Sequence, residues 1–139
     1  MKCGRVLFAT VCVIALGVLL YRGFGRPMRY EIPGEYKGWM VVQFENPACP
    51  PLRSQGAFHV VSVPSSGRVC TSDHHPDRWI YYKFEYVYSD GTRKSLRWND
   101  HGNPGTQVWL IGYRMEDKSD EIFVGDEEAM NHSGAPPSR

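Results

Sequence analysis

Glycine and proline interrupt this chain so often that long helices are excluded over most of its length. The 139 residues include 14 Gly and 10 Pro, many of them in turn-forming pairs. Both residue types disfavour helix interiors and mark turns. The stretches between them are short and rich in β-branched and aromatic residues, as strands are. Because strands and helices do not alternate along the chain, the sequence favours antiparallel sheets over a parallel one.

Seven stretches are predicted as strands. In the strongest, residues 79–88 (WIYYKFEYVY), alternation places Tyr82 and Tyr86 on one face and Lys83 and Glu85 on a second, wetter face. A turn at Asp90-Gly91 leads into the next strand. The remaining elements are strands over 38–44, 57–63, 69–71, 93–98, 106–113 and 122–124, and a short helix over 127–131 capped by Asp126. This pattern predicts a small antiparallel β-sandwich, Ig-like or prealbumin-like, or else a small barrel.

The N-terminal residues differ from the rest of the chain. An uncharged run of 16 residues, 6–21, lies between Arg5 and Arg22, slightly short of the ~20 that cross a bilayer core. We expect an N-terminal hydrophobic helix that serves as an uncleaved signal anchor, with a cleaved signal peptide or a buried core helix as alternatives. Val11 before Cys12 argues against lipidation of that cysteine. The expected organisation is anchor and basic linker over 1–29, sandwich over 30–131 and disordered tail over 132–139.

The cysteines decide the expected compartment. Cys3 and Cys12 fall in the anchor region, which leaves Cys49 and Cys70 as the pair in the folded part. Such a pair in an exported domain is typical of a disulfide, whereas two buried thiols in a cytosolic domain are the alternative. Arginines at 22, 26 and 29 oppose export by the positive-inside rule. We nevertheless expect a single-pass inner-membrane protein with its C-terminal domain in the periplasm or outside, or a secreted one after signal cleavage.

Net charge argues against nucleic acid as a partner. The formal charge is +1, whereas nucleic-acid binders usually carry a strong basic excess. Residues 31–139 contain 11 Lys and Arg against 15 Asp and Glu, a balance of −4. Seven of these carboxylates, with one lysine, fall within 116–128, where we expect a solvated face or tail.

The histidines are weak metal candidates. His74 and His75 are adjacent, so on an extended chain they point to opposite faces and need help from His59 or His101 to hold one ion. We therefore expect no metal and no cofactor. The serines lie in turn-rich segments without a nucleophile-elbow pattern, and a paired Cys49 and Cys70 would leave no thiol for catalysis. We expect the protein not to be an enzyme.

Aromatic residues are the stronger signal. Eight Tyr, four Trp and six Phe are many for this length. A strip of flat rings on a sheet face can bind a sugar or a protein edge. The candidate binding face comprises Trp79, Tyr81, Tyr82 and Tyr86; the alternative is that these rings fill the core.

Several segments resemble a bacterial family of unknown function. The opening segment at 30–39, YEIPGEYKGW, matches that family's Tyr-x-Ile-Pro-x-x-Tyr-x-Gly-Trp pattern. The resemblance continues in 46–52, in 63–67 with 70–72, and in 123–128. Members are short exported or membrane-tethered proteins without an assigned activity. The resemblance implies an exported or membrane-tethered domain and assigns it no chemistry. From the residue patterns above we expect a noncatalytic envelope module, interactive or structural, bound to the membrane through residues 6–21, with an unidentified protein or glycan ligand. The alternative is a small envelope enzyme or metal-binding protein that uses His74, His75 and His101.

Overall fold

The computed structural model describes residues 25–76 and 80–136. The hydrophobic helix expected over 6–21 lies outside these residues, as do Trp79 and the last three residues of the expected tail. No helix in the described part of the chain is long and apolar enough to cross a membrane.

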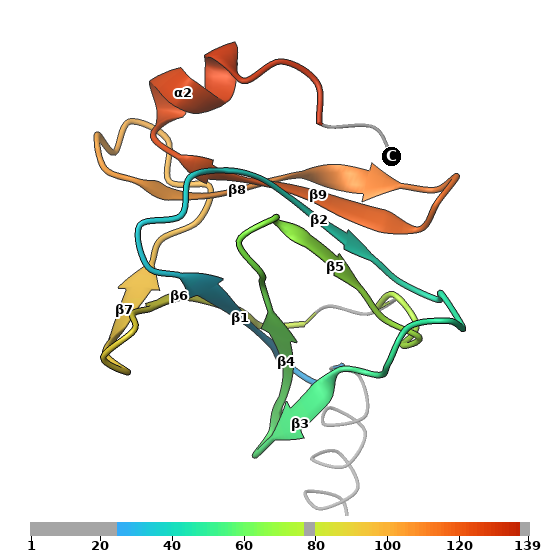
Figure 1. Ribbon diagram of the computed structural model, residues 1–139. Coiled ribbons are helices and arrows are strands. Elements are labelled where there is room, and N and C mark those ends of the chain that lie inside the picture. Colours follow the sequence, from blue (N-terminus) through green and yellow to red (C-terminus); the bar gives the residue numbers. More distant parts are fainter. Residues whose placement is uncertain (1–24, 77–79, 137–139) are drawn as a thin grey trace, which may run out of the picture.

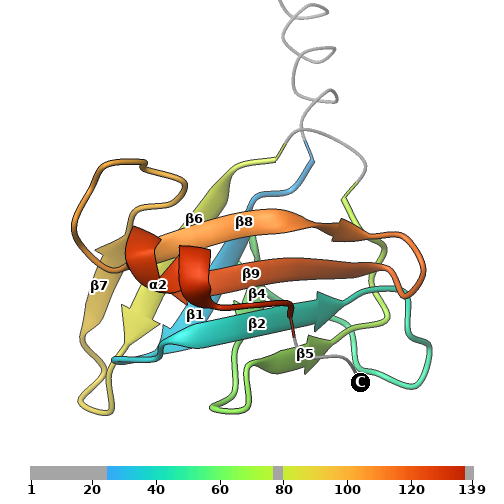
Figure 2. The ribbon, with the colours of Figure 1, turned by 90° about the horizontal axis from the view of Figure 1, so that it is seen from above.

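Nine strands form two sheets that face each other, with one short helix outside them (Figures 1 and 2). The five-stranded sheet has the order β3 (Arg53–Gln55), β4 (Phe58–Ser62), β1 (Met28–Pro33), β6 (Tyr82–Val87) and β7 (Arg93–Leu96). The four-stranded sheet has the order β5 (Arg68–Cys70), β2 (Gly38–Gln43), β9 (Ser119–Gly125) and β8 (Gln107–Arg114). The expected all-β class with a short C-terminal helix, α2 (Glu127–His132), is therefore confirmed.

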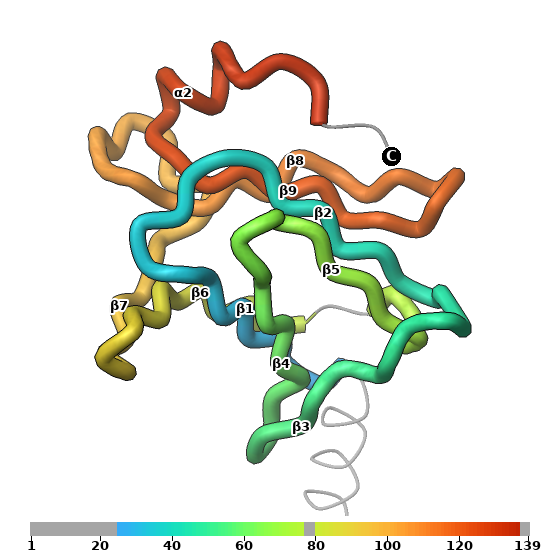
Figure 3. The backbone as a smooth tube through the Cα atoms, in the orientation of Figure 1, coloured from blue at the N-terminus to red at the C-terminus, as the bar shows by residue number. Residues whose placement is uncertain are grey.

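Both sheets are mixed, so the expectation of purely antiparallel sheets is wrong. β1 runs parallel to both of its neighbours, β4 and β6, and β2 runs parallel to β5. The tube in Figure 3 shows the cause: the chain crosses between sheets after β1, β2, β4, β5 and β7. A tight hairpin forces antiparallel pairing, but a strand that returns from the other sheet can enter in either direction.

β1 and β3 are strands in segments where the sequence pattern predicted none. In β1 every second side chain is buried, and these are Met28, Tyr30 and Ile32. Arg29 and Glu31 alternate with them, and the expected boundary between linker and sandwich, at residues 29 and 30, falls inside this strand. β3 is three exposed residues on a sheet edge and carries no hydrophobic pattern.

The core lies between the two sheets. Tyr30 and Phe84 meet at its centre with ring centroids 4.8 Å apart. The buried apolar cluster comprises Met28, Tyr30, Ile32, Met40, Val42, Phe44, Val61, Val63, Phe84, Tyr86, Val108, Ile122 and Val124.

α2 lies outside the four-stranded sheet, capped by the Asp126 carboxylate, which accepts a hydrogen bond from the Ala129 amide at 2.7 Å. Trp109 beside it is buried, and its indole N–H donates to the Gly125 carbonyl.

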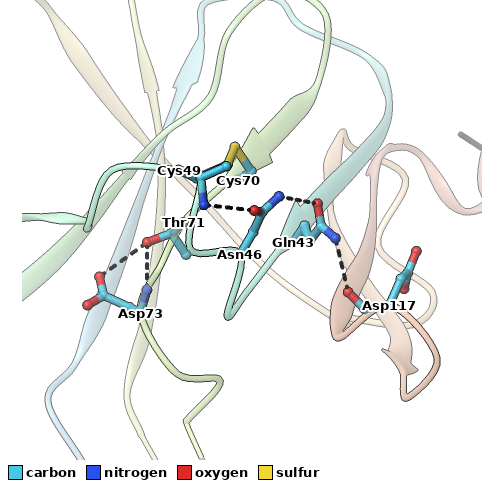
Figure 4. Close-up of a disulfide and its surroundings, with 8 residues drawn as sticks. Gln43, Asn46, Cys49, Cys70, Thr71, Asp73 and Asp117 are labelled. Carbon is cyan, nitrogen blue, oxygen red and sulfur yellow. Dashed lines mark hydrogen bonds between the residues drawn. A yellow bond between two sulfur atoms is a disulfide. The ribbon is translucent and has the colours of Figure 1, made fainter.

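The expected disulfide between Cys49 and Cys70 is present (Figure 4). It ties the loop after β2 to the last residue of β5, with Cα atoms 5.8 Å apart and a sequence separation of 21. Backbone hydrogen bonds run alongside it: the Asn46 amide donates to the Thr71 carbonyl, and the Thr71 amide donates to the Gln43 carbonyl. The cross-link therefore closes a segment that contains the whole of β3 and β4.

Candidate functional site

The aromatic side chains around β6 do not form one surface. Tyr86 is 3% exposed, and its hydroxyl donates to the Tyr36 carbonyl at 2.6 Å. Tyr82 is half-buried, and burial together with the Asp120 carboxylate raises its pKa to about 12. Tyr81 points outward and is 64% exposed. Of the candidate binding face, Tyr82 and Tyr86 thus belong to the interior, Tyr81 belongs to the surface, and Trp79 lies outside the described residues.

The three loop histidines lie beside three different carboxylates. His74 is 3.6 Å from Glu45, and His75 is 3.0 Å from Asp120. His101 is 2.9 Å from Glu127. Within residues 25–76 and 80–136, no three His, Cys, Asp or Glu side chains are grouped to hold a metal ion. The structure therefore does not bring His74, His75 and His101 together.

The pair His75 and Asp120 is the most enclosed of these three. The His75 ring packs against Tyr113, with centroids 4.0 Å apart, and edge-on against Phe44 at 5.1 Å. Burial raises the pKa of the Asp120 carboxyl, and the neighbouring His75 opposes that shift. The fold brings these residues together over 45 positions of sequence. Asp120 was missed because it lies in the acidic stretch expected to be solvated.

A cleft of about 360 Å³ is lined in part by His74 and His75. Met28, Phe44 and Leu52 provide apolar walls, and His59 lines it as well. The His59 Nδ1 atom is buried without a hydrogen-bond partner. Asp73 also lines the cleft, but its carboxylate already accepts from the Leu52 amide at 2.6 Å. The cleft can hold a small apolar group. Its Asp73 carboxylate has a structural role, because it holds the Leu52 amide.

The outer face of the five-stranded sheet carries an ion-pair network. Glu31 on β1 contacts Arg29, Arg53 and Arg93, with the closest N–O distances between 3.0 and 3.2 Å. Glu85 is 5% exposed, although the alternation placed it on the wetter face. It contacts Lys83 at 2.6 Å and Arg93 at 3.2 Å.

These cations change the acidity of Glu85. Burial alone would raise the pKa of Glu85, but hydrogen bonds and charges from Lys83 and Arg93 outweigh it and hold the pKa below its usual range. The carboxylate therefore stays charged while buried. This network could not be predicted from the sequence, because its members come from β1, β3, β6 and β7.

The fold has a counterpart among solved structures. A 2.75 Å crystal structure of a protein from Bacillus anthracis, titled "Putative Lipoprotein", matches with a TM-score of 0.54. The two sequences are 19% identical, and the match covers 82% of each chain. At this identity the likeness shows a shared fold. Among curated proteins, none matches this sequence.

A family model matches residues 25–133, which span the region from before β1 to just past α2. The family carries no assigned function, so the expected membership in a family of unknown function is confirmed. The match includes the disulfide, both sheets and the ion-pair network of the outer face. The chain belongs to the family of unknown function DUF6843.

Proposed function

We propose that this protein is a noncatalytic envelope module, held at the inner membrane by residues 6–21, with its folded domain in the periplasm or outside the cell. Its role is to present an interaction or structural surface to a protein or glycan partner. Secretion after signal cleavage is the alternative location.

The disulfide is the observation that carries this proposal. Disulfides persist in oxidising compartments and are rare in the cytosol. Cys49 and Cys70 meet at bridging distance in the folded domain, and the uncharged run at 6–21 supplies a segment for export. The structural neighbour is described as a lipoprotein, which supports an envelope location as well.

Noncatalytic function is supported by how the polar groups are used. The carboxylates nearest the histidines form ion pairs with them, and Asp73 in the cleft holds a loop amide. The metal-binding alternative gains no support from His74, His75 and His101, because each lies beside a separate carboxylate.

Protease treatment of spheroplasts that express the full chain tests the location. The domain should be degraded while a cytosolic control survives, and non-reducing mass spectrometry should show the linked Cys49 and Cys70 peptides. Intact mass distinguishes the alternatives, because an uncleaved anchor retains residues 1–29. Protection from the protease together with free thiols would overturn the proposal.

A further inference from the structure

We propose that one end of the five-stranded sheet's outer face lies on the bilayer surface and binds the headgroups of anionic phospholipids. This inference rests on the proposed membrane tether, and adds to it a docking face and a ligand class.

The parallel strands define that end. Because β4, β1 and β6 run in the same direction, all three begin at the same edge of the sheet, which we call the tether end. Two backbone hydrogen bonds fix their starts: the His59 amide donates to the Pro27 carbonyl, and the Met28 amide donates to the Tyr81 carbonyl, both at 2.9 Å. Gly25, where the described chain begins, is three residues before Met28 and so within about 11 Å of it. The uncharged run at 6–21, which is the proposed tether, therefore precedes this edge closely in sequence.

Aromatic rings lie nearest the tether end. Phe58 on β4 and Tyr81, just before β6, flank β1 on the outer face with ring centroids 6.4 Å apart. Tyr81 is among the most exposed large hydrophobic side chains of the described residues. In Figure 1 the hairpin that joins β3 to β4 forms the lower end of the domain. Phe58 is the first residue of β4 and follows this hairpin directly.

Behind the aromatic rings comes a row of cations. The register places Arg53, Val60, Arg29 and Lys83 side by side across β3, β4, β1 and β6. The Arg29 guanidinium lies 5.6 Å from the centroid of the Phe58 ring. Among the described residues of these two rows there is no carboxylate.

The carboxylates form the next row, farther from the tether end. Glu31 and Glu85 are register partners on β1 and β6. Arg53 and Lys83 reach back to them at 3.0 Å and 2.6 Å. Away from the tether end, the face thus changes from aromatic to cationic to acidic.

This order matches the layers of a membrane surface. Tyrosine rings prefer the level of the headgroups, and cations near an anionic surface gain about 1 kcal/mol each. The acidic row lies farthest from the lipid, where repulsion is weakest. Residues 31–139 carry a net charge of −4, so this cationic row contrasts with the overall charge balance of the domain.

A fluorescent probe in the full chain tests the docking. Cys3 and Cys12 are first replaced by serine, and an environment-sensitive dye is attached through Ala57→Cys, in the exposed turn before Phe58. Met115→Cys is the matched control, because Met115 is 76% exposed and joins β8 to β9 in the other sheet. The protein is placed in lipid nanodiscs that contain a lipid-borne quencher, with or without phosphatidylglycerol in phosphatidylcholine.

If the domain docks, the lipid-borne quencher should quench the fluorescence of the Ala57 probe strongly in phosphatidylglycerol discs and weakly in discs of phosphatidylcholine alone. The Met115 probe should be quenched weakly in both. Arg53→Gln should lower the docked-to-undocked ratio about fivefold, the value of one cation near the surface. Lys37→Gln, an equal charge change beyond the opposite end of β1, should leave that ratio unchanged.

Three results would overturn the inference. If the chain enters the discs and both probes stay in water, the proposed docking of this face is wrong, whereas the proposed tether is kept. Equal quenching of the Ala57 probe in both lipid mixtures would remove the anionic headgroup as ligand. A chain that fails to enter any disc would remove the tether, and the docking with it.

Discussion

Replacing Cys49 and Cys70 together by serine should lower the stability of the domain by about 3 kcal/mol. The two residues are 21 positions apart in sequence, and closing a loop of this length in the unfolded chain corresponds to about 3 kcal/mol in the chain-entropy model. With an unfolding entropy of about 2.1 cal/mol/K per residue, a domain of about 110 residues would then melt about 13 °C lower.

The native structure around the bridge should survive this change. The Asn46 amide still donates to the Thr71 carbonyl, and the Thr71 amide still donates to the Gln43 carbonyl. These bonds hold the loop after β2 beside the end of β5 without the sulfur atoms. The expected loss therefore comes mainly from the greater freedom of the unfolded chain.

Circular dichroism melting of the full chain in detergent measures the effect. The parent carries Cys3→Ser and Cys12→Ser, so that only Cys49 and Cys70 can react. The oxidised parent should melt highest, and the reduced parent and the Cys49→Ser, Cys70→Ser variant should melt together below it. If the three proteins melt within about 3 °C of one another, which at this size is a stability difference of less than 1 kcal/mol, the reasoning is refuted. Removal of the bridge would then have given the unfolded chain no additional freedom.

Three further changes test the packing and the charges. Glu85→Gln should cost about 1.5–3 kcal/mol at pH 7, as for a hydrogen bond to a charged group. The pKa of Glu85 is lower in the folded state than in the unfolded chain. The stability that the ionised Glu85 contributes is therefore full above the unfolded pKa of about 4.3 and is lost as pH falls through the folded pKa. If Glu85→Gln lowers stability equally in urea melts at pH 7 and at pH 3, this reasoning is contradicted. Gly67→Ala should cost more than 2 kcal/mol, because φ is +71° and a Cβ would lie 2.4 Å from a backbone oxygen. Gly91→Ala, where φ is +84° and the space around a Cβ is open, should cost only about 1 kcal/mol. Equal costs in the same melts would show that the structure relieves the close contact at position 67. Asp126→Ala should cost about 1 kcal/mol and speed hydrogen exchange in α2, and unchanged exchange there would mean that packing alone holds the helix.

Much of the fold could be predicted from local sequence. The strands over 38–44 and 106–113 carry enough β-branched and aromatic residues to be recognised without a structure. The disulfide followed from the number and position of the cysteines. Parallel pairing could not be predicted, because β1 meets β4 and β6 only after the chain has crossed to the other sheet and back.

The polar sites were harder to predict than the strands. Ser119 and Asp120 lie in an acidic stretch, yet both are buried in β9, which begins before the predicted strand at 122–124. A single sequence does not show that a histidine 45 positions earlier packs against Asp120. The row of Arg53, Arg29 and Lys83 likewise exists only in the register of four strands.

The central position of β1 determines how the domain responds to a mechanical load. β1 follows directly on the N-terminal segment and is hydrogen-bonded along both edges, to β4 and to β6. A pull on the chain before Gly25, with the domain held by a partner, acts along the axis of β1 and across its hydrogen bonds. Both ladders are then loaded in shear, so their bonds must break together rather than one after another. The N-terminal end of this domain is therefore built to bear tension.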